Sequence, residues 1–132
     1  SVWCAQEAMQ KHGLEQGRAA LMHDAAEAYV GDLVRPLKMA LRGGAVASAY
    51  DDVEGAFSLV IGQRFGLPAG YDSAPEIKSI DNATCAREME QLRVMPPGWK
   101  PRVKPLKFWP QCWEPHMAER KFLETASLLG LR

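Results

Sequence analysis

The most informative absences in this chain of 132 residues are long apolar runs and an excess of charge of one sign. No apolar stretch comes near the roughly 18 residues that a membrane-spanning helix requires. No leader of charged, then apolar, then small residues opens the chain. Sixteen basic residues balance sixteen acidic ones without forming a block. We therefore expect no membrane partner, no secretion signal and no nucleic-acid surface.

Cysteine is also scarce. Cys4, Cys85 and Cys112 are an odd number, and no two of them lie close in sequence. This usage indicates reduced thiols in a cytoplasm rather than a disulfide framework, so we expect a cytoplasmic protein. A zinc site at Cys112 and His116 would need a second pair of ligands, which the sequence does not supply, so we disfavour it.

Runs that alternate apolar and polar residues, as strands do, are missing, and no segment is repeated. Apolar residues make up 47% and charged residues 24% of the chain, which is an ordinary composition for a folded domain. The length suits one domain with one core. The sequence therefore predicts an all-α, compact single-domain bundle of about five to six helices that spans residues 1–132.

Apolar spacing and helix-ending residues set the expected elements. Helices are predicted over residues 2–12, 15–30, 37–42, 48–65, 73–95 and 115–129, and an irregular segment rich in proline over residues 96–114. Ser73 and Glu76 have the spacing of a capping box at the start of the helix over 73–95. The stripe expected to face the core of the helix over 48–65 consists of Val53, Phe57, Val60, Ile61 and Phe65.

The predicted helix over 15–30 carries polar residues that an apolar helix does not need. His23 and Glu27 are four residues apart and would share one face, and Asp24 follows His23 directly. Buried acids need partners, because an unpaired buried carboxylate costs several kcal/mol. One interpretation is a cation held by His23 and Asp24. The other is that both lie at the edge of the core, since a single His-Asp doublet is a weak signal.

Asp81 is a second acid in an apolar setting. It lies four residues after Ile77 and three before Thr84, on the predicted inner face of the helix over 73–95. It could lie at the rim of that face, or it could share a cation with His23 and Asp24. Imidazole together with carboxylates suits a borderline transition metal better than calcium.

Several segments together resemble the HD-domain phosphohydrolases, in particular their small phage-type and 5′-deoxynucleotidase-like branch. The segments are "SVWCAQEAMQKHG", "HDAAEAYVGDLVRPLK", "IKSIDNATCAREMEQLRVMPP", the tryptophans around residues 109 and 113, and "AERKFLETASLLG". The resemblance thus extends over nearly the whole chain. It implies an HD-type helical fold.

The resemblance also implies roles for individual residues. His23, Asp24 and Asp81 match ligands of one divalent transition metal, which would be Mn, Co, Fe or Zn. The family's first histidine ligand has no counterpart here, and we expect it directly before Ser1, missing through truncation.

Four further residues match positions outside the metal ligands. Glu27 and Asp32 would be the catalytic acids, Lys38 would hold the substrate phosphate, and Pro36 would pack against the base or sugar.

The implied reaction is hydrolysis of phosphate esters of nucleotides, with deoxynucleoside 5′-monophosphates as the preferred substrates. Two alternatives stay open: a deoxynucleoside triphosphate triphosphohydrolase of the same fold, and a non-catalytic HD module that senses a nucleotide. A helical structural protein is the third, and it predicts that replacing Asp24 or Asp81 by alanine is harmless. Relatives of this kind are often oligomers, so a homo-oligomer is possible.

Overall fold

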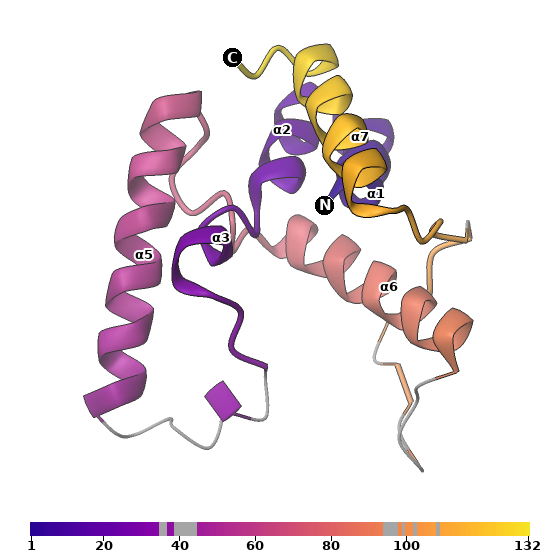
Figure 1. Ribbon diagram of the computed structural model, residues 1–132, viewed down its shortest axis with the longest axis horizontal. Coiled ribbons are helices and arrows are strands. Elements are labelled where there is room, and N and C mark those ends of the chain that lie inside the picture. The colour runs from indigo at the N-terminus through magenta and orange to yellow at the C-terminus, as the bar shows by residue number, and fades with distance from the viewer. Residues whose placement is uncertain (35–36, 39–44, 94–97, 99, 102, 108) are drawn as a thin grey trace.

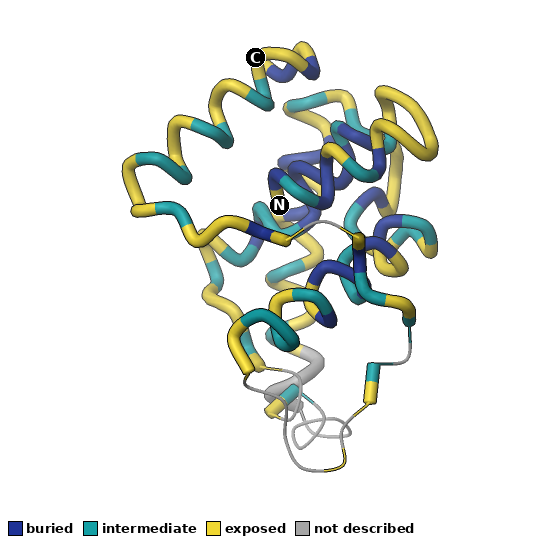
Figure 2. The backbone as a smooth tube through the Cα atoms, turned by 90° about the vertical axis from the view of Figure 1, so that its right-hand side faces the viewer, coloured by how far each residue is buried: buried dark blue, intermediate teal, exposed yellow. Residues whose placement is uncertain are grey.

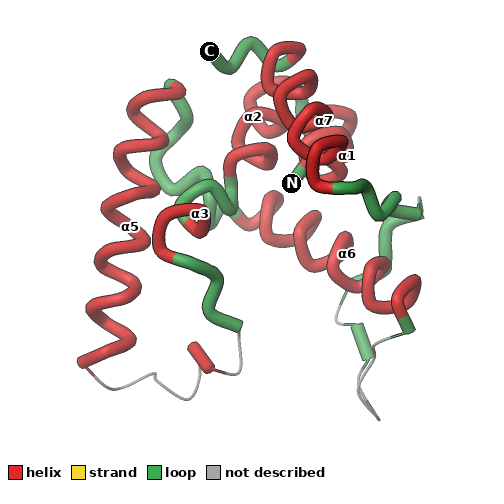
Figure 3. The backbone as a smooth tube through the Cα atoms, in the orientation of Figure 1, coloured by secondary structure: helices red, strands yellow, loops and turns green. Residues whose placement is uncertain are grey.

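Helices are the regular secondary structure of the residues described by the computed structural model, which are all except 35–36, 39–44, 94–97, 99, 102 and 108. They are α1 (Val2–His12), α2 (Leu14–Met22), α3 (Glu27–Val30), α5 (Ala45–Phe65), α6 (Pro75–Leu92) and α7 (Pro115–Leu128). No strand occurs in this described part (Figure 3), which confirms the predicted all-α class. That the whole chain is one HD domain stays a prediction.

Helices α1 and α2 fold back on each other across a single glycine. Gly13 has a φ of 95°, a left-handed conformation that residues with a side chain rarely adopt. Four residues later, a Cβ added at Gly17 would lie 2.9 Å from the Cβ of Met9. The two helices can therefore approach this closely only because Gly17 has no side chain.

The core forms where α6 and the C-terminal end of the chain meet this pair. Figure 2 shows the buried residues gathered around α1 and α2. Leu21 and Ile77 are the largest fully buried side chains of the described part, and burial of each stabilises the fold by about 1.5–3 kcal/mol. The main apolar members from the four contributing segments are Val2, Cys4, Ala5, Ala8, Ala19, Ala20, Leu21, Met22, Ile77, Ile80, Leu129 and Leu131.

The segment before α7 runs along α6, as predicted for an irregular stretch. Leu106 is buried, and its backbone N–H donates to the carbonyl oxygen of Ala83 over 3.2 Å. Its own carbonyl accepts a hydrogen bond from Nε of Arg87. Two backbone groups of one residue thus fix this part of the segment to α6.

Helix α5 lies beside α3 (Figure 1), and it reaches the core only near its C-terminal end, through Ile61 and Phe65. The predicted core-facing stripe of this helix is largely wrong, because Val53, Phe57 and Val60 are exposed and Ile61 is buried. The ring of Phe57 stacks on Tyr29 of α3 with centroids 4.9 Å apart. Within the described ranges, no helix combines the length and apolar content needed to cross a bilayer.

The start of α6 also differs from the prediction. Ser73 does not cap this helix, because its hydroxyl donates to the carbonyl oxygen of Gly70 over 3.1 Å. Ala74 occupies the N-cap position without a side-chain bond, and Pro75 begins the helix. Proline suits the first helical position, where its missing N–H leaves no bond unmade. The predicted helix over 37–42 lies mostly outside the described residues.

Candidate metal centre

The predicted helix over 15–30 is interrupted at the His-Asp doublet. Helix α2 ends at Met22 and α3 begins at Glu27, with a turn over residues 23–26. In the turn, the N–H of Ala25 donates to the carbonyl of Met22 and the N–H of Glu27 to that of Asp24, at 2.9 and 3.0 Å. These bonds span three residues instead of four, as in a 3₁₀ turn. His23 and Glu27 therefore do not lie one turn apart on one regular helix.

His23 is the buried member of the doublet, with 5% of its surface exposed. Its Nδ1 lies 2.8 Å from the carbonyl oxygen of Ala20. Because a carbonyl oxygen can only accept, Nδ1 must carry the proton of a neutral ring, and Nε2 then presents a lone pair. This backbone contact fixes the orientation of the ring.

Nε2 of His23 faces two carboxylates that come from different parts of the chain. It lies 3.0 Å from Oδ2 of Asp24 and 3.5 Å from Oδ1 of Asp81 on α6. The distances are those of ion pairs, but the alignment leaves buried Nε2 without a hydrogen-bond partner. A lone pair against two anions is repulsive, so this arrangement requires a cation between them, either a proton or a metal.

The electrostatics of the metal-free site follow from this arrangement. Burial opposes charge on His23, but the carboxylates of Asp24 and Asp81 outweigh it and raise the pKa of the ring to about 9. The pKa of Asp81 is lowered, chiefly through its interaction with His23. Without a metal, the proton on Nε2 therefore supplies the positive charge that the two carboxylates need.

A third potential ligand, Cys4 of α1, lies at the same point. One ligand atom each from Cys4, His23 and Asp81 lies within 4.8 Å of the other two. The Sγ atom is 3.3 Å from Oγ1 of Thr84, and burial raises the pKa of the thiol. Sequence reasoning treated Cys4 as a reduced thiol and did not assign it to the site. The sequence carries no sign of this role, because Cys4 meets Asp81 only through the packing of α6 against α1.

The two predicted catalytic acids lie at the outer edge of the doublet. Glu27 begins α3 and is partly buried, and Asp32 is exposed just after Gly31. Burial raises the pKa of Glu27, and the carboxylates of Asp24 and Asp32 raise it further. The structure thus brings Asp24, Glu27 and Asp32 into one group of interacting acids.

Lys38, the predicted phosphate ligand, is already paired. Its Nζ lies 3.3 Å from Oε1 of Glu54 on α5 and 5.2 Å from the centre of the Tyr50 ring. The Tyr50 hydroxyl in turn donates to the carbonyl of Gly31 over 2.6 Å. Helix α5 therefore holds the loop after α3, and Glu54 is a residue that sequence reasoning did not single out. Pro36 lies outside the described residues.

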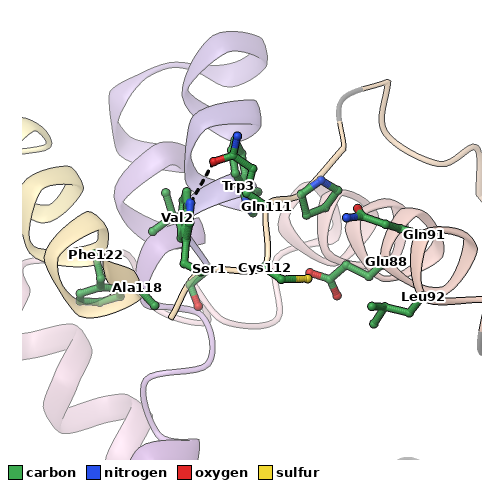
Figure 4. Close-up of a pocket in the computed structure, with 12 residues that line it drawn as sticks. Ser1, Val2, Trp3, Glu88, Gln91, Leu92, Gln111, Cys112, Ala118 and Phe122 are labelled. Carbon is green, nitrogen blue, oxygen red and sulfur yellow. Dashed lines mark hydrogen bonds between the residues drawn. The ribbon is translucent and has the colours of Figure 1, made fainter. Parts of the chain in front are cut away.

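A cavity of about 370 Å³ opens between the start of α1, the second half of α6 and the segment before α7 (Figure 4). Trp3 and Trp113 line it, with their rings stacked at 5.0 Å. Glu88 also lines it, and burial raises the pKa of that carboxyl. The first three residues of the chain line the cavity and directly precede Cys4. The predicted metal ligands are not among the described residues that line it.

Comparison with known proteins adds little to this geometry. No family model matches the chain, and no solved structure matches it. Over 76 residues it is 34% identical to an uncharacterized protein of Rhodobacter capsulatus, a match that covers 56% of this chain. The chain spans only 36% of the length of that relative. The comparisons therefore assign no family.

Proposed function

We propose that the protein is a metal-dependent phosphohydrolase of the HD-domain type, which cleaves phosphate esters of (deoxy)nucleotides and prefers deoxynucleoside 5′-monophosphates. The observation that carries this proposal is the environment of His23. A ring nitrogen that is buried and has no hydrogen bond faces carboxylates from two separate segments. The two carboxylates are partly exposed, so an ion from the solvent can reach the point where they and the imidazole nitrogen converge.

The donor set fits a divalent transition metal. The proposed ligands are His23, Asp24 and Asp81, and Mn, Co, Fe and Zn all accept imidazole and carboxylate. The hydrogen bond from Nδ1 of His23 to the Ala20 carbonyl is the support that ligating histidines usually have. When bound, such a cation neutralises charge on a phosphate ester and makes coordinated water more acidic.

The chain's own acids would move the protons. The raised pKa of Glu27 makes its carboxylate a stronger base toward an attacking water. Asp32 supplies a second carboxyl nearby, which could instead act on the leaving oxygen. Lys38 would bind the phosphate after exchanging its contact with Glu54 for the substrate. Pro36 remains the proposed contact to the base or sugar.

The cavity at the start of α1 has room for a small-molecule substrate. Its volume of about 370 Å³ falls in the usual range for small-molecule sites, which is about 300–1,000 Å³. The stacked rings of Trp3 and Trp113 at its wall offer the flat apolar surface on which a base can pack. We further propose that the enzyme acts in the cytoplasm and that copies associate into a homo-oligomer.

The test is a panel of deoxynucleoside mono- and triphosphates, assayed on the full-length gene product with each of the four metals. The expected products are inorganic phosphate and a nucleoside from the monophosphates. Asp81→Ala should abolish the activity, whereas Asp52→Ala, a change of an exposed acid on α5, should leave it intact. Triphosphate released from the triphosphates would favour the alternative triphosphohydrolase. If neither class is cleaved with any metal, the enzymatic proposal fails and a nucleotide sensor becomes the better account.

A further inference from the structure

Cys4 is the buried group at the metal centre that the proposed function does not use. Its side chain is 2% exposed, and its Sγ lies among the ligand atoms of His23 and Asp81 that are all within 4.8 Å of one another. Ligand atoms around a tetrahedral zinc lie about 3.5 Å apart, given bond lengths of about 2.0–2.3 Å. Nε2 of His23 and Oδ1 of Asp81 are already 3.5 Å apart. Cys4, whose Sγ is within 4.8 Å of both, would complete the set by moving closer to them.

A second feature points to a ligand at the same place. His23 is more than nine-tenths buried, and its Nε2 lies 3.0 Å from Asp24 and 3.5 Å from Asp81 without the alignment of a hydrogen bond to either. Three different donor atoms, from α1, the turn after α2 and α6, thus converge on one point. A thiol that served only as a small apolar core residue would have no reason to lie against this nitrogen and carboxylate.

We propose that the Cys4 thiolate is a protein ligand of the metal, together with His23 and Asp81. This inference rests on the proposed function in one respect, namely that a divalent metal binds at this centre. It adds that the donor set contains sulfur, nitrogen and oxygen, which selects Zn, Co or Fe over the harder ions Mn and Mg. On binding, the thiol releases its proton to the solvent.

The surroundings of Cys4 suit this role. Oγ1 of Thr84 lies 3.3 Å from Sγ and donates to the carbonyl of Ile80 over 2.9 Å. When the thiol is deprotonated, this hydroxyl can turn to donate to the sulfur, which is the outer-shell support that metal ligands usually have. With Asp24, the remaining ligand of the proposed function, Cys4 and its two fellow ligands would make four protein ligands. Substrate or water would then bind by expanding the coordination to five, as catalytic zinc sites can do.

The experiment is a cobalt titration of the metal-free full-length protein, followed by absorption spectroscopy. A thiolate bound to Co²⁺ gives a charge-transfer band in the near ultraviolet, whereas nitrogen and oxygen ligands give only weak visible bands. We expect this band to saturate at one equivalent in the wild type and in Cys85→Ser and Cys112→Ser, which change exposed cysteines. It should vanish in Cys4→Ala and in Cys4→Val, which fills the site with a slightly larger apolar side chain.

The same variants separate the possible outcomes. Zinc affinity should fall by at least about tenfold to a hundredfold in Cys4→Val, because even outer-shell changes cost that much, while manganese affinity should change far less. If the wild type binds cobalt without the near-ultraviolet band, Cys4 is a core residue and this proposal is overturned, although the proposed function stands. If the wild type binds no cobalt at all, both fail.

Discussion

At the scale of single residues, His23 explains why acids lie in an apolar part of the chain. Its Nδ1 is held by the Ala20 carbonyl, and its Nε2 is left to two carboxylates. Nε2 faces a second carboxylate besides Asp24, because Oδ1 of Asp81 on α6 lies 3.5 Å from it. A positive charge at Nε2 is therefore part of the folded structure, whether a proton or a metal supplies it.

This arrangement predicts how the stability of the metal-free protein depends on pH. The pKa of His23 is raised in the folded state from 6.5 to about 9, so protonation favours folding. The contribution is fully present below pH 6.5 and is lost as the pH rises through about 9. Urea unfolding in the presence of a chelator should show the free energy of unfolding falling across this interval.

The matched variant is His23→Gln, which cannot titrate there. Its free energy of unfolding should be lower than that of the wild type near pH 6.5 and should change less between pH 6.5 and 9. An equal pH dependence in the two proteins would show that another group is responsible.

At the scale of helices, the close approach of α1 and α2 sets the position of Cys4 relative to His23. Gly17 permits this approach, because a Cβ there would meet the Cβ of Met9 at 2.9 Å and Cδ2 of Leu129 at 3.3 Å. The Cβ of Met9 is fixed to the backbone and cannot move aside by rotation. The missing side chain at Gly17 therefore determines how closely α1 and α2 pack.

Gly17→Ala should destabilise the fold by about 1–3 kcal/mol, the usual cost of overpacking. This cost outweighs the gain of about 1 kcal/mol that alanine brings to a helix interior. Gly55→Ala on α5 is the control, since nothing lies within 4 Å of an added Cβ, and it should be neutral or slightly stabilising. Thermal unfolding of both variants decides the matter, and a Gly17→Ala protein as stable as the wild type would contradict the packing described.

The helix scale also shows where sequence reasoning succeeds and where it stops. The helix over 2–12 was predicted with the bounds that α1 has, because Gly13 ends it at a positive φ. The helix over 15–30 was predicted as continuous, since nothing in its composition announces the turn at residues 23–26. At this turn His23 meets Asp81, a contact between residues far apart in sequence. Local spacing cannot reveal it.

The same limit applies to the other residues of the site. Asp81 was recognisable because an acid on an apolar helix face is unusual, and it does approach His23. Cys4 was not, because a cysteine on such a face is an ordinary core residue. Glu54 was also missed, since its partner Lys38 comes near it only through the packing of α5. In each case the missing information is tertiary.

At the scale of the whole molecule, α5 joins the core through Ile61 and Phe65 at its C-terminal end and the loop after α3 through its first half. Lys38, Tyr50 and Glu54 connect it to the loop after α3. Several of its apolar residues are exposed, including Val53, Leu59 and Val60. These contacts hold Lys38, the proposed phosphate ligand, on the side of the molecule where Asp24, Glu27 and Asp32 lie.

If Lys38 binds the substrate phosphate, Lys38→Ala should raise KM for the nucleotide by about tenfold or more, since a hydrogen bond to a charged group contributes about 1.5–3 kcal/mol. Lys38→Arg should restore much of the binding, because it keeps the charge. Lys104→Ala, in an exposed part of the segment before α7, serves as the control. Unchanged kinetics in Lys38→Ala would remove this residue from the substrate site.

The central claim is that His23 and Asp81 hold a metal ion. The most direct measurement is the metal content of the purified full-length protein after dialysis against each of the four candidate ions. We predict about one ion per chain for the wild type and Asp52→Ala, and none for His23→Gln and Asp81→Ala with their helical content retained. A wild type without stoichiometric metal, or an Asp81→Ala protein that still binds one ion, would contradict the account.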